Sequence, residues 1–82
     1  MTSTGKHLKD ALTPHFERKN VSVRMLGVLM QVEIRIPYQM DPGVRGEAEA
    51  KAREKAEEAV KPVIAENPWL TSERFQLIIK SQ

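Results

Sequence analysis

The chain has 82 residues, a length typical of one small domain, and it contains no cysteine. The absence of cysteine excludes a disulfide framework, a thiolate metal site and a cysteine nucleophile. Because small secreted domains usually depend on disulfides, the composition favours a cytoplasmic protein. Thirteen Lys and Arg against eleven Asp and Glu give a net charge of +2, which is less than a dedicated nucleic-acid binder usually carries.

No part of the sequence is typical of a secreted precursor or a membrane protein. Residues 1–7 contain no apolar stretch of the kind that signal peptides carry. The longest apolar run, residues 25–30, is far shorter than the ~20 residues that cross a bilayer. We therefore expect a single domain over residues 1–82, with residues 1–5 as a flexible tail and no membrane contact.

A first helix is predicted over residues 6–19. Apolar residues recur there at a spacing of four, which places them on one face of a helix. Pro14 has no backbone N–H to donate, so we expect the helix to break next to it and residues 14–19 to form a separate turn. The apolar face consists of Leu8, Leu12 and Phe16.

Residues 21–36 carry the clearest β pattern. Apolar residues occupy odd positions from Val21 to Met25 and even positions from Leu26 to Ile36. Since a strand has a period of two, this change of parity requires a hairpin or a bulge near Gly27. We favour the hairpin, because one strand over the whole segment would be unusually long, and a bulge remains the alternative.

A long second helix is predicted over residues 47–66, after a loop over residues 39–46. Alanine recurs along its buried stripe and favours helix, and its Glu, Lys and Arg side chains are typical of a solvated face. Residues 74–80 alternate as a last strand. The sequence therefore predicts an α+β fold of order α-β-β-α-β. We expect a two-layer sandwich whose three-stranded, mainly antiparallel sheet carries two helices on one face.

No set of side chains in the sequence forms a recognisable catalytic or metal centre. His7 and His15 would lie about 12 Å apart along a helix, too far to share a metal ion. The acidic residues fall mainly on the solvated helix face, and no serine has the surroundings of a nucleophile. We therefore expect a protein that is not an enzyme, with no catalytic residue, no bound metal and no cofactor.

A Gly-x-x-Gly pattern, Gly43 to Gly46, directly precedes the predicted long helix. Together with the order of elements, this pattern resembles a type II KH domain over roughly residues 8–80, provided that residues 38–42 hold a short additional helix. The resemblance implies binding of single-stranded RNA or DNA through main-chain N–H groups of the glycine loop. Under this alternative hypothesis the site residues are Gly43, Arg45, Gly46, Arg24 and Arg35.

Apolar side chains in the predicted loops indicate contact with another protein. Trp69 follows a proline, a combination that often anchors a protein interface. The alternative for Trp69 is that it covers the end of the small core. The succession of strand, long helix and strand is also similar to small bacteriophage tail-completion proteins, which implies assembly through sheet edges and loops. The leading hypothesis is a small binding or adaptor module that contacts another protein or itself, as a phage structural or regulatory component in the cytoplasm or the virion. Its contact residues are Trp69, Leu70, Tyr38, Met40 and Leu29.

Overall fold

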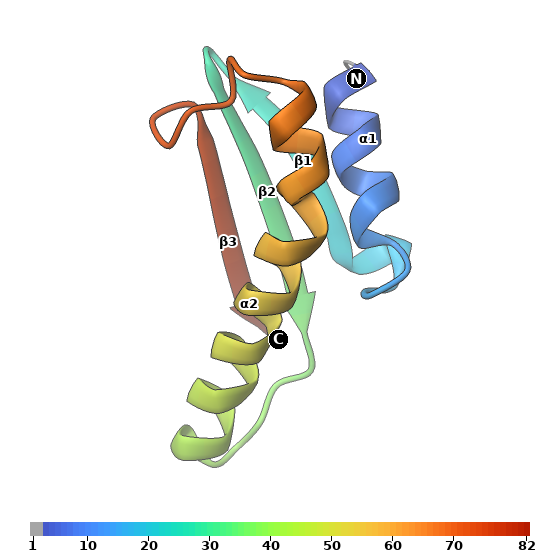
Figure 1. The fold of residues 1–82 in the computed structure, drawn as a ribbon. Coiled ribbons are helices and arrows are strands. Elements are labelled where there is room, and N and C mark those ends of the chain that lie inside the picture. The colour runs from blue at the N-terminus through green and yellow to red at the C-terminus, as the bar shows by residue number, and fades with distance from the viewer. Residues whose placement is uncertain (1–2) are drawn as a thin grey trace.

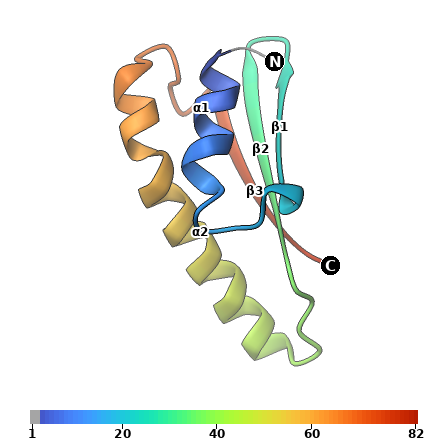
Figure 2. The same ribbon diagram turned by 90° about the vertical axis from the view of Figure 1, so that its right-hand side faces the viewer.

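The computed structural model describes residues 3–82 as a three-stranded sheet with two helices packed on one of its faces (Figure 1). The side view separates the helical layer from the sheet (Figure 2). The α+β class, the element order and the two layers are therefore as predicted. The elements are α1 (Ser3–Leu12), the short 3-10 helix η1 (Arg18–Asn20), β1 (Val21–Leu26), β2 (Leu29–Ile36), α2 (Pro42–Glu66) and β3 (Phe75–Ser81).

The sheet is mixed, with the strand order β1-β2-β3. β1 pairs with β2 in the antiparallel direction, whereas β3 runs parallel to β2. The parallel pair arises because α2 carries the chain back along the sheet, so that β3 begins at the same end as β2. The prediction of a mainly antiparallel sheet therefore holds for one of the two pairings.

A tight hairpin joins β1 and β2, which confirms the hairpin and excludes the bulge. Gly27 has a φ of 64°, and no other described residue has a positive φ. Gly27 and Val28 form the two-residue turn, and glycine at its first position is the pattern of a type II′ turn. The turn brings Met25 opposite Met30. Odd positions of β1 and even positions of β2 therefore share one face of the sheet, which explains the change of parity in the sequence.

The first helix occupies different residues from those predicted. It begins at Ser3, earlier than the predicted residue 6, and ends at Leu12, two residues before Pro14, so the expected break is confirmed. After the break, residues 13–15 form a turn and residues 18–20 the 3-10 helix η1. The expected flexible tail is wrong for residues 3–5, and residues 1–2 lie outside the described part of the chain. Thr4 is buried, and its hydroxyl donates a hydrogen bond of 3.0 Å to the side-chain oxygen of Asn67. This contact holds the start of α1 against the end of α2.

The core lies between the helical layer and the inner face of the sheet. On α2 the buried side chains are small or β-branched, which lets the helix approach the sheet closely. No helix within residues 3–82 is long and apolar enough to cross a membrane. The largest fully buried side chains are Leu8, Leu12, Val21, Met30, Val32, Ile34 and Val60, and α2 also contributes Ala52, Ala56 and Val63.

The long helix begins earlier than predicted and extends past the sheet. It starts at Pro42 instead of Glu47, so residues 42–46 are helical where a loop was expected. None of its residues before Ala52 is buried. In Figures 1 and 2 this end of α2 projects beyond the sheet together with the segment that leads to it. We refer to residues 38–48 as the arm.

Candidate protein-contact surfaces

The large apolar side chains that the described chain exposes gather at the two ends of β2. The hairpin tip, residues 25–28, lies at one end of the molecule, and the arm lies at the other (Figure 1). Each group consists of residues close together in sequence. The hairpin tip exposes Met25, Leu26 and Val28, and the arm exposes Tyr38, Met40 and Val44, of which Met40 is the most open at 88%.

The tyrosine of the arm is held in place by its neighbours. The guanidinium of Arg45 lies 5.0 Å from the centre of the Tyr38 ring, and its Nη1 donates a hydrogen bond to the tyrosine hydroxyl. The backbone N–H of Tyr38 donates to the carbonyl of Gln82 at 3.1 Å. A ring that is exposed yet already oriented loses little conformational freedom when a partner covers it. The arm is therefore a prearranged contact surface.

The glycine pattern lies in the first turn of α2, and its amides already have an acceptor. Asp41 is the N-cap residue, and its Oδ1 accepts hydrogen bonds from the N–H groups of Gly43 at 2.8 Å and Val44 at 3.2 Å. The segment from Pro37 to Asp41 is not helical, so the short additional helix that a KH domain would place there is not formed. A phosphate group at this helix end would have to displace a carboxylate of the chain itself.

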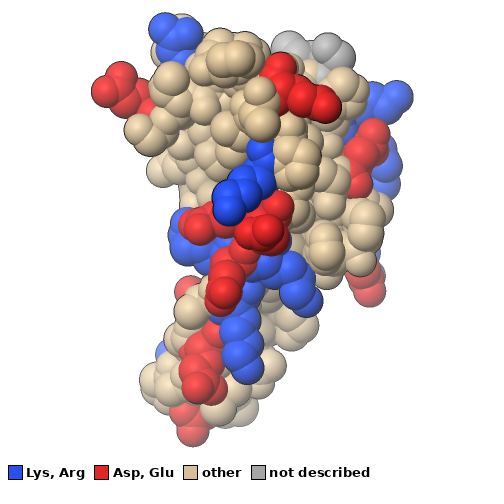
Figure 3. Space-filling model, viewed as in Figure 1, with Lys and Arg blue, Asp and Glu red and all other residues tan. Residues whose placement is uncertain are grey.

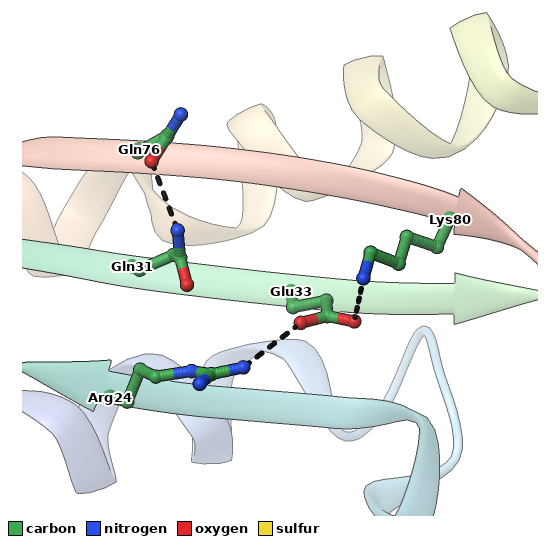
Figure 4. A network of polar contacts seen from close by, with 5 residues as sticks. All are labelled: Arg24, Gln31, Glu33, Gln76 and Lys80. Atoms are coloured by element: carbon green, nitrogen blue, oxygen red, sulfur yellow. Dashed lines mark hydrogen bonds and ion pairs between the residues drawn. The ribbon is translucent and has the colours of Figure 1, made fainter.

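The arginines of the nucleic-acid hypothesis are engaged elsewhere. Arg24 lies opposite Gln31, toward the hairpin end of the sheet, whereas the arm leaves the other end of β2. Its guanidinium pairs with Glu33 at 3.5 Å, on the sheet face that the helices leave open (Figure 4). Arg35 donates a hydrogen bond of 2.7 Å to the carbonyl of Lys19. The structure therefore does not gather Arg24 with the glycines of the arm.

The open face of the sheet satisfies most of its own polar groups. Glu33 lies between two cations, since it also pairs with Lys80 at 3.2 Å, and Gln31 donates a hydrogen bond to Gln76 at 3.1 Å (Figure 4). Cross-strand pairs of this kind stabilise a solvated sheet surface. This face carries charge of both signs and no aromatic side chain, so it offers no stacking platform for nucleic-acid bases.

Three of the predicted contact residues lie at the hairpin end, away from the arm. Leu70 is 4% exposed and belongs to the core, so its assignment as a contact residue is wrong. Trp69 is half-buried against the core, and Leu29 is half-buried at the start of β2. Tyr38 follows the end of β2, whereas Trp69 precedes the start of β3, at the opposite end of the sheet, where Phe75 pairs with Met30. One molecule therefore does not combine these side chains into a single patch.

A groove that the sequence did not predict runs along α2. Its volume is about 720 Å³, and His15 forms one wall. A smaller groove, floored by Phe16 and Ile36, continues it toward the arm and shares Lys51 and Lys55 with it. Figure 3 shows acidic and basic side chains interleaved along α2. The other residues that line the first groove are Lys51, Glu54, Lys55, Glu58, Ala59 and Pro62.

No family model, curated protein or solved structure matches the chain. Within residues 3–82, no group of three or more His, Asp or Glu side chains is placed to hold a metal ion.

Proposed function

We propose that this domain is a small non-catalytic binding module that acts through protein–protein contact, and that it associates with itself. The observation that carries the proposal is the arm, which projects from the sheet and exposes Tyr38, Met40 and Val44 within a segment of seven residues. Full burial of an aliphatic side chain of this size contributes about 1.5–3 kcal/mol. A partner that covers the arm would gain part of this energy, which must exceed the cost of association.

The composition of the arm supports contact with protein. Tyrosine and arginine are enriched among the residues that dominate binding energy at interfaces, and methionine adapts its shape to different partners. In the arm, Tyr38 and Arg45 are already in contact, and Met40 lies between them in sequence and is almost fully exposed. The acidic cap Asp41 and the nearby Glu47 disfavour phosphate at the same place, so protein contact ranks ahead of nucleic-acid binding.

Sedimentation velocity over concentrations from about 10 μM to about 1 mM tests the proposal. We expect the wild type to sediment faster as its concentration rises. Met40→Ser and Val44→Ser should weaken this association, because each removes apolar area from the arm. Val28→Ser is the matched control, since it makes the same kind of change at the hairpin tip, at a side chain that is 68% exposed.

Two outcomes would contradict the proposal. One is a wild type that remains monomeric over the whole range. The other is tight binding of single-stranded RNA or DNA that weakens steeply between about 50 and 200 mM salt, the behaviour of a protein that contacts phosphates.

A further inference from the structure

We infer that α2 is the dimerisation element, and that it packs against α2 of a second copy in the antiparallel direction. This inference rests on the proposed function and names the partner surface. It is carried by a stripe of α2 that faces away from the sheet, which we call the α2 stripe. The α2 stripe consists of Val44, Glu47, Lys51, Glu54, Lys55, Glu58, Pro62 and Ala65, all of which are exposed.

These residues lie on one side of the helix. At about 100° per residue, they fall within about 100° of its surface, and the buried residues Ala52, Ala56, Val60 and Val63 lie on the other side. Five residues of the α2 stripe, Lys51, Glu54, Lys55, Glu58 and Pro62, line the groove beside His15, so a second helix would enter that groove. A second helix can lie along it while α2 remains packed on the sheet.

The charges of the α2 stripe are complementary to themselves when the helix direction is reversed. A twofold axis that passes between Glu54 and Lys55 places Lys51 opposite Glu58 of the second copy. The same axis places Glu54 opposite Lys55 of the second copy. By symmetry, each of these pairs occurs twice, so four opposite-charge pairs line the middle of the interface. At the ends, the axis places Val44 opposite Ala65, an apolar pair.

The single chain leaves most of these charges without a partner. Among the ion pairs of residues 3–82, only Lys61 with Glu58, at 3.7 Å, involves α2, so Lys51, Glu54 and Lys55 make none. Lys51 and Lys55 are four residues apart, which makes them like-charge neighbours on the helix, and Glu54 and Glu58 form a second such pair. Opposite charges three or four residues apart, such as Glu47 with Lys51 and Lys55 with Glu58, offset these like-charge pairs within one helix, and an antiparallel second helix would add opposite charges between copies.

The antiparallel arrangement also provides contacts for the arm. In one molecule Met40 and Trp69 lie beyond opposite ends of α2. Reversal about the centre of the helix brings the arm of one copy beside the turn that carries Trp69 in the other. The exposed Met40 and the half-buried indole of Trp69 could then cover one another. Two of the contact residues expected from the sequence, Met40 and Trp69, would thus meet between copies, although the single chain holds them apart.

The size of this interface implies a weak dimer. The helices would overlap over about 36 Å, and a contact about 10–12 Å wide buries on the order of 400 Å² on each copy. Stable interfaces bury about 800 Å² on each partner. We therefore expect a dissociation constant in the micromolar range or weaker, which rises with salt because the charged pairs are solvent-exposed.

Charge-reversal variants test the arrangement. In a homodimer of Lys51→Glu, the new Glu of each copy faces Glu58 of the other copy. In a homodimer of Glu58→Lys, the new Lys of each copy faces Lys51 of the other copy. We expect each variant to raise the dissociation constant about tenfold or more. An equimolar mixture of the two variants should form a heterodimer, because every altered pair is then opposite in charge. Lys51→Glu with Glu58→Lys in one chain should restore the homodimer for the same reason.

Lys55→Glu with Glu54→Lys is a second exchange that should leave dimerisation unchanged. Circular dichroism and thermal unfolding would verify that each variant folds. If the single reversals dimerise like the wild type, or if the mixture shows no heterodimer, the antiparallel α2 contact is wrong. The proposed function would still hold if Met40→Ser weakened an association that these charge reversals did not affect. A wild type that stays monomeric at about 1 mM would overturn both.

Discussion

The hydroxyl of Thr4 donates a hydrogen bond to the side-chain oxygen of Asn67 across a separation of 63 residues. Asn67 is the C-cap residue of α2. The nitrogen of its side-chain amide, Nδ2, donates a hydrogen bond of 2.7 Å to the carbonyl of Val63. One asparagine side chain therefore closes the end of α2 and fixes the start of α1. The two helices that form the helical layer are joined at their ends by this contact.

Thr4→Val should destabilise the domain by about 1 kcal/mol. Valine keeps the shape of the side chain but leaves the oxygen of Asn67 without its donor in a partly buried place. Chemical denaturation of Thr4→Val, Asn67→Ala and the double variant would measure the coupling between them. An additive double variant would show that the hydrogen bond contributes nothing.

Two glycine substitutions should have opposite effects. Gly27→Ala should destabilise the domain by about 1 kcal/mol, because the turn requires a φ of 64° that a residue with a Cβ disfavours. Gly46→Ala should stabilise it by up to about 1 kcal/mol, since Gly46 lies within α2 and a Cβ there meets no atom within 4 Å. Thermal unfolding measures both changes. A stabilising Gly27→Ala or a destabilising Gly46→Ala would contradict the assignment of the turn and of the helix start.

Asp41→Ala should unravel the first turn of α2. It removes the acceptor of the N–H groups of Gly43 and Val44, a loss that costs about 1 kcal/mol at a helix N-terminus. Because the arm projects from the sheet, we expect the loss to appear mainly as faster hydrogen exchange in residues 43–46. Asp41→Asn, which keeps a capping oxygen, is the control. Equal exchange in Asp41→Ala and the wild type would show that the cap is unimportant.

Glu33→Gln should lower stability by at most about 1 kcal/mol, and only at low salt. Glu33 pairs with Arg24 and Lys80, whose side chains are largely solvent-exposed, and such pairs are weak and screened by salt. Glu73→Gln is a matched control, because Glu73 is exposed and forms no ion pair within the described chain. A loss that persisted at about 1 M salt would show that a hydrogen-bond network, not charge, stabilises this face.

The parts of the fold that follow a strict period could be predicted from the sequence. The change of parity at Gly27 predicted the hairpin, because burial of one sheet face forces alternation with a period of two. The start of α2 was missed because residues 39–46, which include Asp41 and Pro42, were interpreted as a loop. An acidic N-cap followed by proline at the first helical position is also a helix start, and the structure shows that arrangement.

The contact surface was harder to predict than the fold. Both Trp69 and Leu70 follow a helix-ending proline, and only tertiary packing buries Leu70 and leaves Trp69 partly open. The charges of α2 were predicted to form a solvated face, and the structure exposes Lys51, Glu54, Lys55 and Glu58. Sequence spacing indicates pairs within one helix and does not indicate the pairs between copies that we propose. The groove beside His15 requires the end of α1 to lie against the middle of α2, and no local pattern encodes that approach.

Distances between spin labels on two copies would test the antiparallel α2 dimer most directly. Because the chain has no cysteine, one introduced cysteine can carry the only label on each copy. Labels at Glu57→Cys and Glu66→Cys would lie on α2 outside the α2 stripe. Antiparallel packing about the centre of α2 predicts that the two labels at position 57 lie within about 20 Å of each other. It predicts that the two labels at position 66 lie about 35 Å apart, from the helix rise of 1.5 Å per residue. Short distances at both positions would contradict the antiparallel packing. The absence of dipolar coupling between labels on two copies at about 1 mM would also contradict it.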